Sequence, residues 1–253
     1  MSYTETWSNG HGQVKFFTRS DGSRLRYYTA GAGPAVVLIH TVRTQLDYFA
    51  RVIPQLWDSY TGYMNAVTLA GESLGGALAL GASIDLKARV SKVVAFNSYD
   101  YPAGLERGNL FARFIVQRDT NAWAGAGFRP YGKPADPARG NAGRRRRQKQ
   151  AWSGLPRRAP EERAPQGIST SGRAIYRSLK GFQRARQRYP QVSAPVALVY
   201  SERDWSRPRE RDHVAGLLAD VQRVTLPNTG HFSALEYPNA MTRILLQSLE
   251  LPN

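Results

Sequence analysis

The stretch VTLAGESLGGALALGAS, residues 67–83, constrains the fold more than any other part of the sequence. A short apolar run, typical of a buried strand, leads directly into an Ala- and Leu-rich run typical of a helix. Between them lies Ser73, with Gly71 two positions before it and Gly75 two positions after it. Glycines at these places let neighbouring elements approach closely. The pattern G-x-S-x-G therefore predicts a sharp strand–turn–helix that lifts the Ser73 hydroxyl above a sheet.

Strand-like and helix-like patterns alternate along most of the remaining chain, which favours a three-layer α/β domain with a mostly parallel sheet and helices on both faces. The segments that predict strands are 13–19, 24–31, 36–39, 66–71, 91–102, 194–205 and 222–232. The segments that predict helices are 46–60, 74–90, 104–116, 172–189, 209–221 and 238–251. Residues 20–22 (Ser-Asp-Gly) indicate a tight turn between the first two strands.

The net charge of +16 is concentrated in one segment. Residues 129–190 hold seventeen Lys and Arg but only three acidic residues, so this quarter of the chain carries +14. Its Gly, Pro and Arg content is typical of flexible chain. We expect a cap or lid insertion at 104–190 between two parts of one core, 1–103 and 191–253. The arginines 144–147 are not interleaved with aromatic residues, so no specific nucleic-acid partner is expected.

Composition limits the other classes of site and location. The chain has no cysteine, which excludes a disulfide scaffold and a thiolate zinc site. The polar N-terminus lacks the pattern of a secretory signal, and no run approaches about 18 uncharged apolar residues. We therefore expect a cytoplasmic protein with no membrane partner, no metal and no cofactor. The sequence carries no signal for an oligomeric state.

A serine hydroxyl is a weak nucleophile near neutral pH and needs a base, which in turn needs an orienting group. The chain has four histidines. His231 lies in a predicted loop between the last strand and the last helix. His11 falls in the polar N-terminal tail, His213 inside a predicted surface helix and His40 at the end of a buried strand. We therefore predict that His231 is the base.

The orienting acid is expected at the end of a strand. Asp204, in YSERDWSRP, meets this condition, while Glu202 and Asp100 are its competitors. The resulting chain order of Ser73, Asp204 and His231 is the order that accompanies the G-x-S-x-G elbow in α/β-hydrolases.

Four stretches together resemble the α/β-hydrolase superfamily, in the form that carries a cap after a core strand. They are DGSRLRYYTAGAGPAVVLIH, LAGESLGG, YSERDWSRP and LPNTGHFSALEYP. The likeness covers about 1–103 and 191–253. It implies a three-layer α/β-hydrolase-like fold with an inserted, partly irregular cap, and a serine hydrolase that acts on an ester-like small molecule.

The resemblance also implies a role for each site residue. Ser73 would attack an acyl carbonyl, His231 would carry the proton, and Asp204 would hold the imidazole. The backbone N–H groups of Leu74 and Val42 would form the oxyanion hole. Dehalogenase and epoxide hydrolase chemistry are disfavoured, because those relatives use an aspartate at the elbow.

Two departures from the family pattern support an alternative, a catalytically impaired or dead hydrolase-like scaffold with a binding role. Thr41 stands where relatives usually have glycine, and Ser73 follows His40 by only 33 positions. That spacing is too short for the usual strand and helix before the elbow strand, so one βα unit is expected to be absent. We then expect strand 24–31 to pair with strand 36–39 in a sheet of about seven strands, and hydrolysis to be slow and confined to activated esters.

Overall fold

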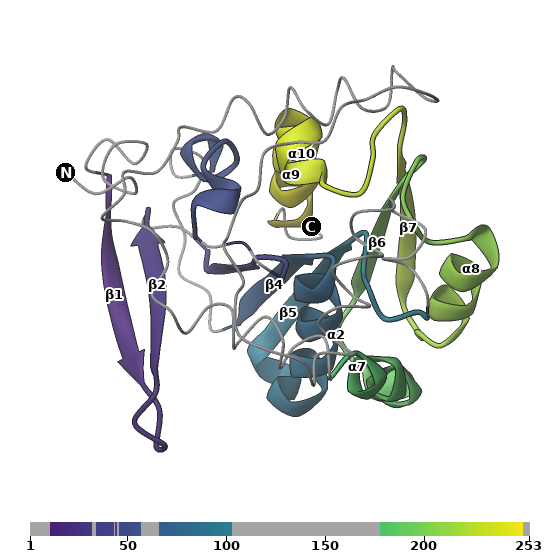
Figure 1. The fold of residues 1–253 in the computed structure, drawn as a ribbon, viewed down its shortest axis with the longest axis horizontal. Coiled ribbons are helices and arrows are strands. Elements are labelled where there is room, and N and C mark those ends of the chain that lie inside the picture. The colour runs from purple at the N-terminus through teal and green to yellow at the C-terminus, as the bar shows by residue number, and fades with distance from the viewer. Residues whose placement is uncertain are drawn as a thin grey trace, which may run out of the picture.

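A computed structural model describes residues 11–31, 34–42, 44, 46–56, 66–102 and 178–249. These residues form a two-stranded sheet and a separate five-stranded sheet (Figure 1). The strands are β1 (Gly12–Thr18), β2 (Arg24–Ala30), β3 (Val36–Ile39), β4 (Val67–Glu72), β5 (Val90–Phe96), β6 (Val196–Ser201) and β7 (Val221–Leu226).

The five-stranded sheet is parallel throughout and has the order β3-β4-β5-β6-β7. The three inner strands, β4, β5 and β6, are short and largely apolar runs rich in Val, Leu and Ala, which suits strands buried on both faces. The edge strand β7 is half polar and exposes Gln222, Arg223 and Thr225. Because all five run the same way, their carboxyl ends meet at one edge of the sheet. Ser73, which follows β4, lies at that edge.

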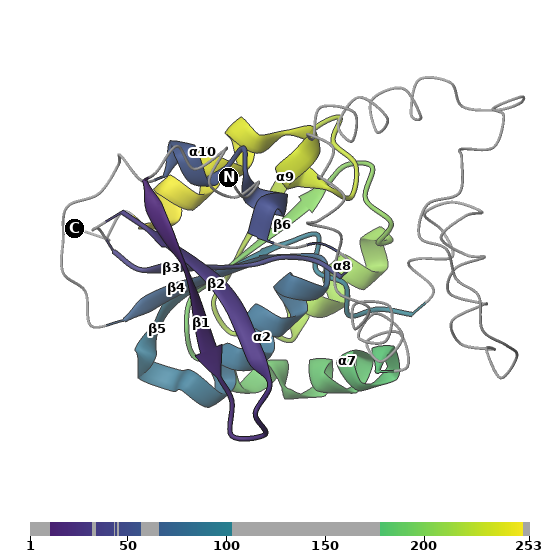
Figure 2. The same cartoon turned by 60° about the vertical axis from the view of Figure 1, so that its left-hand side comes forward.

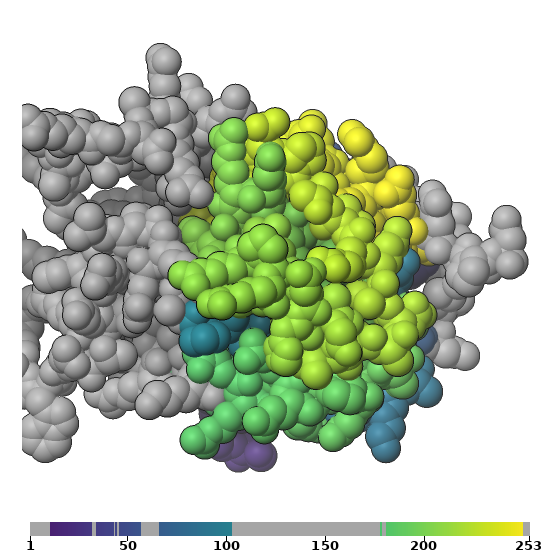
Figure 3. Space-filling view, turned by 90° about the vertical axis from the view of Figure 1, so that its right-hand side faces the viewer, coloured from purple at the N-terminus to yellow at the C-terminus, as the bar shows by residue number. Residues whose placement is uncertain are grey.

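Helices cover both faces of this sheet. The helical segments are η1 (Leu46–Phe49), η2 (Ile53–Gln55), α2 (Leu74–Leu86), η3 (Lys87–Arg89), α7 (Leu179–Ala185), η5 (Arg186–Gln191), α8 (Pro208–Gly216), α9 (Ser233–Glu236) and α10 (Pro238–Leu249). The space-filling view shows a face built from the α7, α8 and α10 parts of the chain (Figure 3).

Alternate residues of the central strands point into two different hydrophobic cores. Leu69 of β4 and Val93 of β5 pack in one core with α2 and α8. Their neighbours Ala70 and Val94 pack in the other core with η1, α9 and α10. The period of two along each strand therefore fills both faces. The three-layer, mostly parallel α/β fold expected from the sequence is confirmed (Figure 2).

The helix predicted over residues 46–60 is wrong within its described part, 46–56. The chain forms only two short 3₁₀ segments there, η1 and η2. Pro54 lies inside the second of them. Proline has no N–H to donate and its ring clashes with the preceding turn, so an apolar pattern at helical spacing does not become a continuous helix. The apolar side chains of Tyr48, Phe49 and Val52 are nevertheless buried against the sheet.

The predicted pairing of strand 24–31 with strand 36–39 is also wrong. Among the described residues, β2 pairs only with β1, in an antiparallel hairpin, and β3 pairs only with β4. Both β2 and β3 therefore form edges. The hairpin stands apart from the main sheet (Figure 1). Four of its large apolar side chains are 41–58% exposed: Phe16, Phe17, Leu25 and Tyr27.

We expect this hairpin to open more readily than the core. An isolated two-stranded sheet is marginally stable in water, and local opening costs little where few apolar contacts form. In native-state hydrogen exchange, the amides of β1 and β2 should be protected at least about 100-fold less than those of β4–β6. Equal amide protection in the two sheets would contradict this expectation, because it would mean that contacts other than those seen in the exposed hairpin stabilise β1 and β2.

Most of the predicted cap and the interval in which a βα unit is expected to be missing lie outside the described residues. The cap is described only from residue 178 onward, as α7 and η5, and the interval 57–65 before β4 is not described. The boundaries 1–103, 104–190 and 191–253, and the missing unit, therefore stay predictions. None of the helices in the described part of the chain combines the length and the hydropathy that a membrane span requires.

Candidate active site

The turn between β4 and α2 has the sharp geometry that the G-x-S-x-G pattern predicts. Ser73 has φ 60° and ψ −120°, a conformation that L-residues rarely adopt. A side chain at Gly71 would collide with the backbone of Gly75, and one at Gly75 would collide with the carbonyl of Ile39. The two glycines are therefore required by the close packing of β3, β4 and α2 around the serine.

The end of β5 holds this turn in place. The Ser73 N–H donates to the Phe96 carbonyl over 2.8 Å, and the Tyr99 N–H donates to the Ser73 carbonyl over 3.0 Å. Both backbone groups of Ser73 are thus bound, which stabilises its unusual dihedral angles. The hydroxyl is left to face the loop that follows β7.

That loop places His231 against the serine. The Nε2 atom of His231 lies 2.8 Å from the Ser73 hydroxyl, within the range expected of a nucleophile and its base. The two side chains come from positions 158 residues apart. Ser73 is 4% exposed and His231 is 2% exposed, so their contact is shielded from bulk water.

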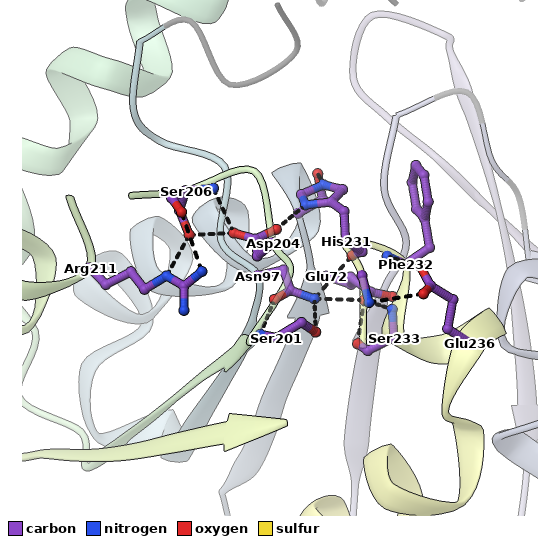
Figure 4. Close-up of polar contacts among 12 residues, drawn as sticks. Glu72, Asn97, Ser201, Asp204, Ser206, Arg211, His231, Phe232, Ser233 and Glu236 are labelled. Carbon is purple, nitrogen blue, oxygen red and sulfur yellow. Dashed lines mark hydrogen bonds and ion pairs between the residues drawn. The ribbon is translucent and has the colours of Figure 1, made fainter. Parts of the chain in front are cut away.

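Asp204, in the loop after β6, lies at the other ring nitrogen. Its Oδ1 is 2.5 Å from His231 Nδ1, and its Oδ2 accepts hydrogen bonds from the N–H and hydroxyl of Ser206 (Figure 4). Burial by itself raises the pKa of the Asp204 carboxyl. The neighbouring His231 and the hydrogen bonds from His231 and Ser206 outweigh burial, so the pKa is lowered. Asp204 is therefore held as a carboxylate.

Asp100, the competing acid, is buried elsewhere. Its Oδ2 accepts hydrogen bonds from the hydroxyls of Ser98 and Tyr189 at 3.2 and 2.8 Å. Burial raises the pKa of its carboxyl, opposed by the Tyr189 hydrogen bond. The other competitor, Glu202, accepts from the N–H of Asn228. Since both nitrogens of His231 already face Ser73 and Asp204, neither competitor occupies the position of the acid.

The rival histidines occupy other positions in the fold. His213 is inside α8, as predicted, and His40 follows β3 and contacts Thr41 and Thr44 through Nδ1. Burial lowers the pKa of His40, which favours a neutral ring. His11 is an exposed residue just before β1.

Aromatic side chains surround the base. The indole of Trp205 stacks on the His231 ring, with centroids 3.8 Å apart and planes 9° from parallel. Tyr99 approaches the same ring edge-on, with centroids 6.5 Å apart. Tyr99 and Leu74 also belong to a small apolar cluster to which Trp205 and Val42 add partly buried contacts. These apolar side chains, called the apolar wall below, therefore lie on one side of Ser73.

The two predicted oxyanion-hole residues lie at neighbouring strand ends. Leu74 is the first residue of α2, so its N–H has no partner within the helix. Val42 follows β3 and packs against the cluster that contains Leu74. The connection after β3 contributes to one face of the sheet and α2 covers the other. Open α/β sheets bind ligands where the connections that follow two neighbouring strands run to opposite faces of the sheet.

A buried polar network beneath the triad was not predicted. It joins Glu72, the last residue of β4, and Asn97, which follows β5, to the backbone of His231 and Ser233 (Figure 4). The sequence offered one signal for it, since Glu72 is an acid within an otherwise uncharged stretch, 67–83. Asn97 carried no comparable signal, because its role depends on a positive φ of 46° and on partners distant in the chain.

Comparison with protein families gives one match that spans nearly the whole chain. The model of the family described as "Alpha/beta hydrolase family" matches residues 8–243. A search of curated proteins gives no match.

Solved structures with a similar fold include several enzymes. A thermophilic esterase from Thermogutta terrifontis is 16% identical, with a TM-score of 0.58, covering 94% of this chain and 100% of that one. Haloalkane dehalogenase DbeA from Bradyrhizobium elkani is 13% identical, with a TM-score of 0.63, covering 94% and 98%. A serine hydrolase involved in carbazole degradation is 18% identical, with a TM-score of 0.54, covering 94% and 98%. At these identities the likeness concerns the fold.

Proposed function

Because the chain belongs to the alpha/beta hydrolase family, we propose that it is a serine hydrolase that cleaves an ester-like small molecule through a covalent acyl-enzyme. The observation that carries this proposal is the continuous contact from Ser73 through His231 to Asp204. Its two links are 2.8 Å and 2.5 Å long, and all three side chains are buried. Buried nucleophile, base and carboxylate in this order are what acyl transfer requires.

In the proposed reaction, the Ser73 oxygen attacks the carbonyl carbon of the ester while His231 Nε2 takes the hydroxyl proton. The negative charge that develops on the carbonyl oxygen is met by the N–H groups of Leu74 and Val42. When the tetrahedral intermediate collapses, His231 returns the proton to the leaving alcohol. Water, activated by the same histidine, then attacks the acyl-enzyme and releases the acid.

Asp204 and Trp205 support the charge that appears on His231 during each step. The carboxylate faces Nδ1, so it attracts the imidazolium and fixes which ring nitrogen faces Ser73. The indole lies flat against the ring, where its π face attracts a cation. Neither contribution needs a cofactor. A serine at the elbow, in place of the aspartate that dehalogenation uses, favours ester chemistry over carbon–halogen cleavage.

We expect turnover to be slow and restricted to esters with good leaving groups. Thr41 places a side chain beside the oxyanion-hole turn, where relatives usually have glycine. With p-nitrophenyl acetate and butyrate, kcat should lie well below the roughly 10 s⁻¹ typical of enzymes. Ethyl esters of the same acids should give no measurable turnover.

The same assay can show the acyl-enzyme directly. If deacylation is slower than acylation, stopped-flow traces should show a burst of nitrophenol equal to the enzyme concentration. Efficient turnover of the ethyl esters would contradict the restricted specificity. Absence of any nitrophenyl ester hydrolysis by folded protein would instead favour the scaffold without catalysis.

A further inference from the structure

A second carboxylate lies beside the nucleophile but takes no part in the proposed proton transfers. Glu72 is the last residue of β4 and directly precedes Ser73, and its side chain has no exposure to solvent. Its carboxylate accepts hydrogen bonds from the Tyr48 hydroxyl at 2.5 Å, the Ser233 N–H at 2.5 Å and the Ser233 hydroxyl. The Ala234 N–H, at 3.2 Å, is a further donor.

Such a carboxylate is unfavourable at this depth unless donors surround it. Burial raises the pKa of Glu72, and the hydrogen bonds from Ser233 and Tyr48, together with the nearby His231, offset part of that rise. The donors come from η1 on one side and from the start of α9 on the other. Glu72 therefore joins the nucleophile strand to two segments that are distant in sequence.

The segment held at α9 carries the base. Ser233 and Ala234 lie two and three residues after His231. The carbonyl of His231 itself accepts a hydrogen bond from Asn97 Nδ2 over 3.0 Å, and Asn97 Nδ2 also lies 3.4 Å from Glu72. The base is thus fixed to the ends of both β4 and β5.

A third side chain completes the support from within α9. Glu236 accepts hydrogen bonds from the N–H groups of Gly230 and Phe232, the two neighbours of His231, over 2.9 and 3.3 Å (Figure 4). Glu236 moves with the loop that it holds, because both belong to one short segment. Glu72 differs in that it is bonded covalently to Ser73, so it can set the distance between the serine and the base.

We propose that Glu72 is a positioning residue that fixes His231 at hydrogen-bonding distance from Ser73, a role that rests on the function proposed above. Through the path Glu72–Ser233–His231, β4 sets the place of the base as well as that of the nucleophile. The carboxylate also attracts the positive charge that forms on His231 when it takes the serine proton.

The test is Glu72→Gln, which keeps the size of the side chain but turns one acceptor into a donor. The amide N–H₂ would then face a backbone N–H in either orientation, that of Ser233 at one oxygen position or that of Ala234 at the other. The hydroxyls of Tyr48 and Ser233 can turn to accept, but these backbone groups can only donate. A displacement of the base by about 1 Å can cost about 10²-fold in rate. We therefore expect kcat for p-nitrophenyl acetate to fall about 10²-fold, with KM changed less than about threefold, since the apolar wall is untouched.

Glu202→Gln is the matched control. Glu202 also accepts a backbone N–H, that of Asn228 at 2.7 Å, but Glu202 is exposed and its partner lies three residues before His231 rather than in the α9 segment that Glu72 holds. Its replacement should leave kcat within about twofold. Ser233→Ala serves as a second, milder variant, because it removes only one donor to Glu72. It should lower kcat in the same direction as Glu72→Gln. An unchanged kcat in folded Glu72→Gln protein would overturn the proposal.

A readout that does not depend on activity separates this proposal from the proposed function. The proton between His231 Nδ1 and Asp204 should give a low-field ¹H NMR resonance in the wild type. In Glu72→Gln it should shift or disappear, while Glu202→Gln should preserve it. If the wild type hydrolyses no ester, the proposed function fails. The NMR resonance then tests on its own whether Glu72 positions His231. A resonance that is identical in Glu72→Gln and the wild type would mean that Glu72 does not position the base.

Discussion

Ser73→Ala is expected to lower kcat for p-nitrophenyl acetate by about 10⁶-fold. The variant removes the atom that forms the acyl-enzyme, so the two-step route is lost. The buried His231 and the oxyanion-hole N–H groups remain, so a residual rate above that in water, of about 10³- to 10⁴-fold, should persist. Kinetics of the purified variant, checked for native folding by circular dichroism, measure this effect.

Ser83→Ala is the appropriate control for this loss. Ser83 is another buried serine, inside the helix α2 that follows Ser73, and its hydroxyl donates to the Leu80 carbonyl one turn earlier. Its replacement should leave kcat within about twofold, since Ser83 touches no residue of the triad. A Ser73→Ala protein that kept most of the wild-type rate would mean that the hydrolysis arises from another group or from a contaminant.

Asp204→Asn is expected to lower kcat by about 10⁴-fold. An amide in place of the carboxylate cannot stabilise the imidazolium and allows the ring to adopt the wrong tautomer. The bond of 2.5 Å between Asp204 Oδ1 and His231 Nδ1 is the contact that would be lost. KM should change little, because Asp204 contacts His231 at Nδ1, whereas the ring faces Ser73 through Nε2.

Asp100→Asn provides the comparison that identifies the acid. Asp100 also follows a core strand and is also buried, but its carboxylate contacts Ser98 and Tyr189. Its replacement should reduce kcat by less than about tenfold. If instead Asp100→Asn caused the larger loss, the acid would have been assigned to the wrong strand, although the chemistry at Ser73 would stand.

The features that the sequence predicted correctly depend on local patterns with strong physical constraints. The elbow at Ser73 needs glycine at two places, and the short apolar runs of β4, β5 and β6 suit strands buried on both faces. The positions of Ser73, Asp204 and His231 could be predicted because each residue follows a recognisable strand, while their catalytic roles stay predictions. The structure brings the three together at the carboxyl edge of the sheet.

The features that were mispredicted or missed depend on contacts between distant segments. Residues 46–56 bury their apolar side chains in the core without forming a continuous helix. Their spacing is compatible with both arrangements, so it did not distinguish two 3₁₀ turns from one long helix. The β1–β2 hairpin was recognisable, but its separation from the main sheet is a matter of tertiary packing. The links of Glu72 to Tyr48 and Ser233 join residues 24 and 161 positions apart, beyond the reach of any local pattern.

The central claim is that Ser73 is a nucleophile activated by His231, and covalent labelling tests it most directly. A fluorophosphonate probe reacts with an activated serine and leaves a stable adduct, which intact-mass and peptide mass spectrometry can locate. We predict one adduct per molecule, on the peptide that contains Ser73, absent in Ser73→Ala and strongly reduced in His231→Ala. Folded wild-type protein that takes up no probe, or carries it on another residue, would contradict the account and favour a scaffold without catalysis.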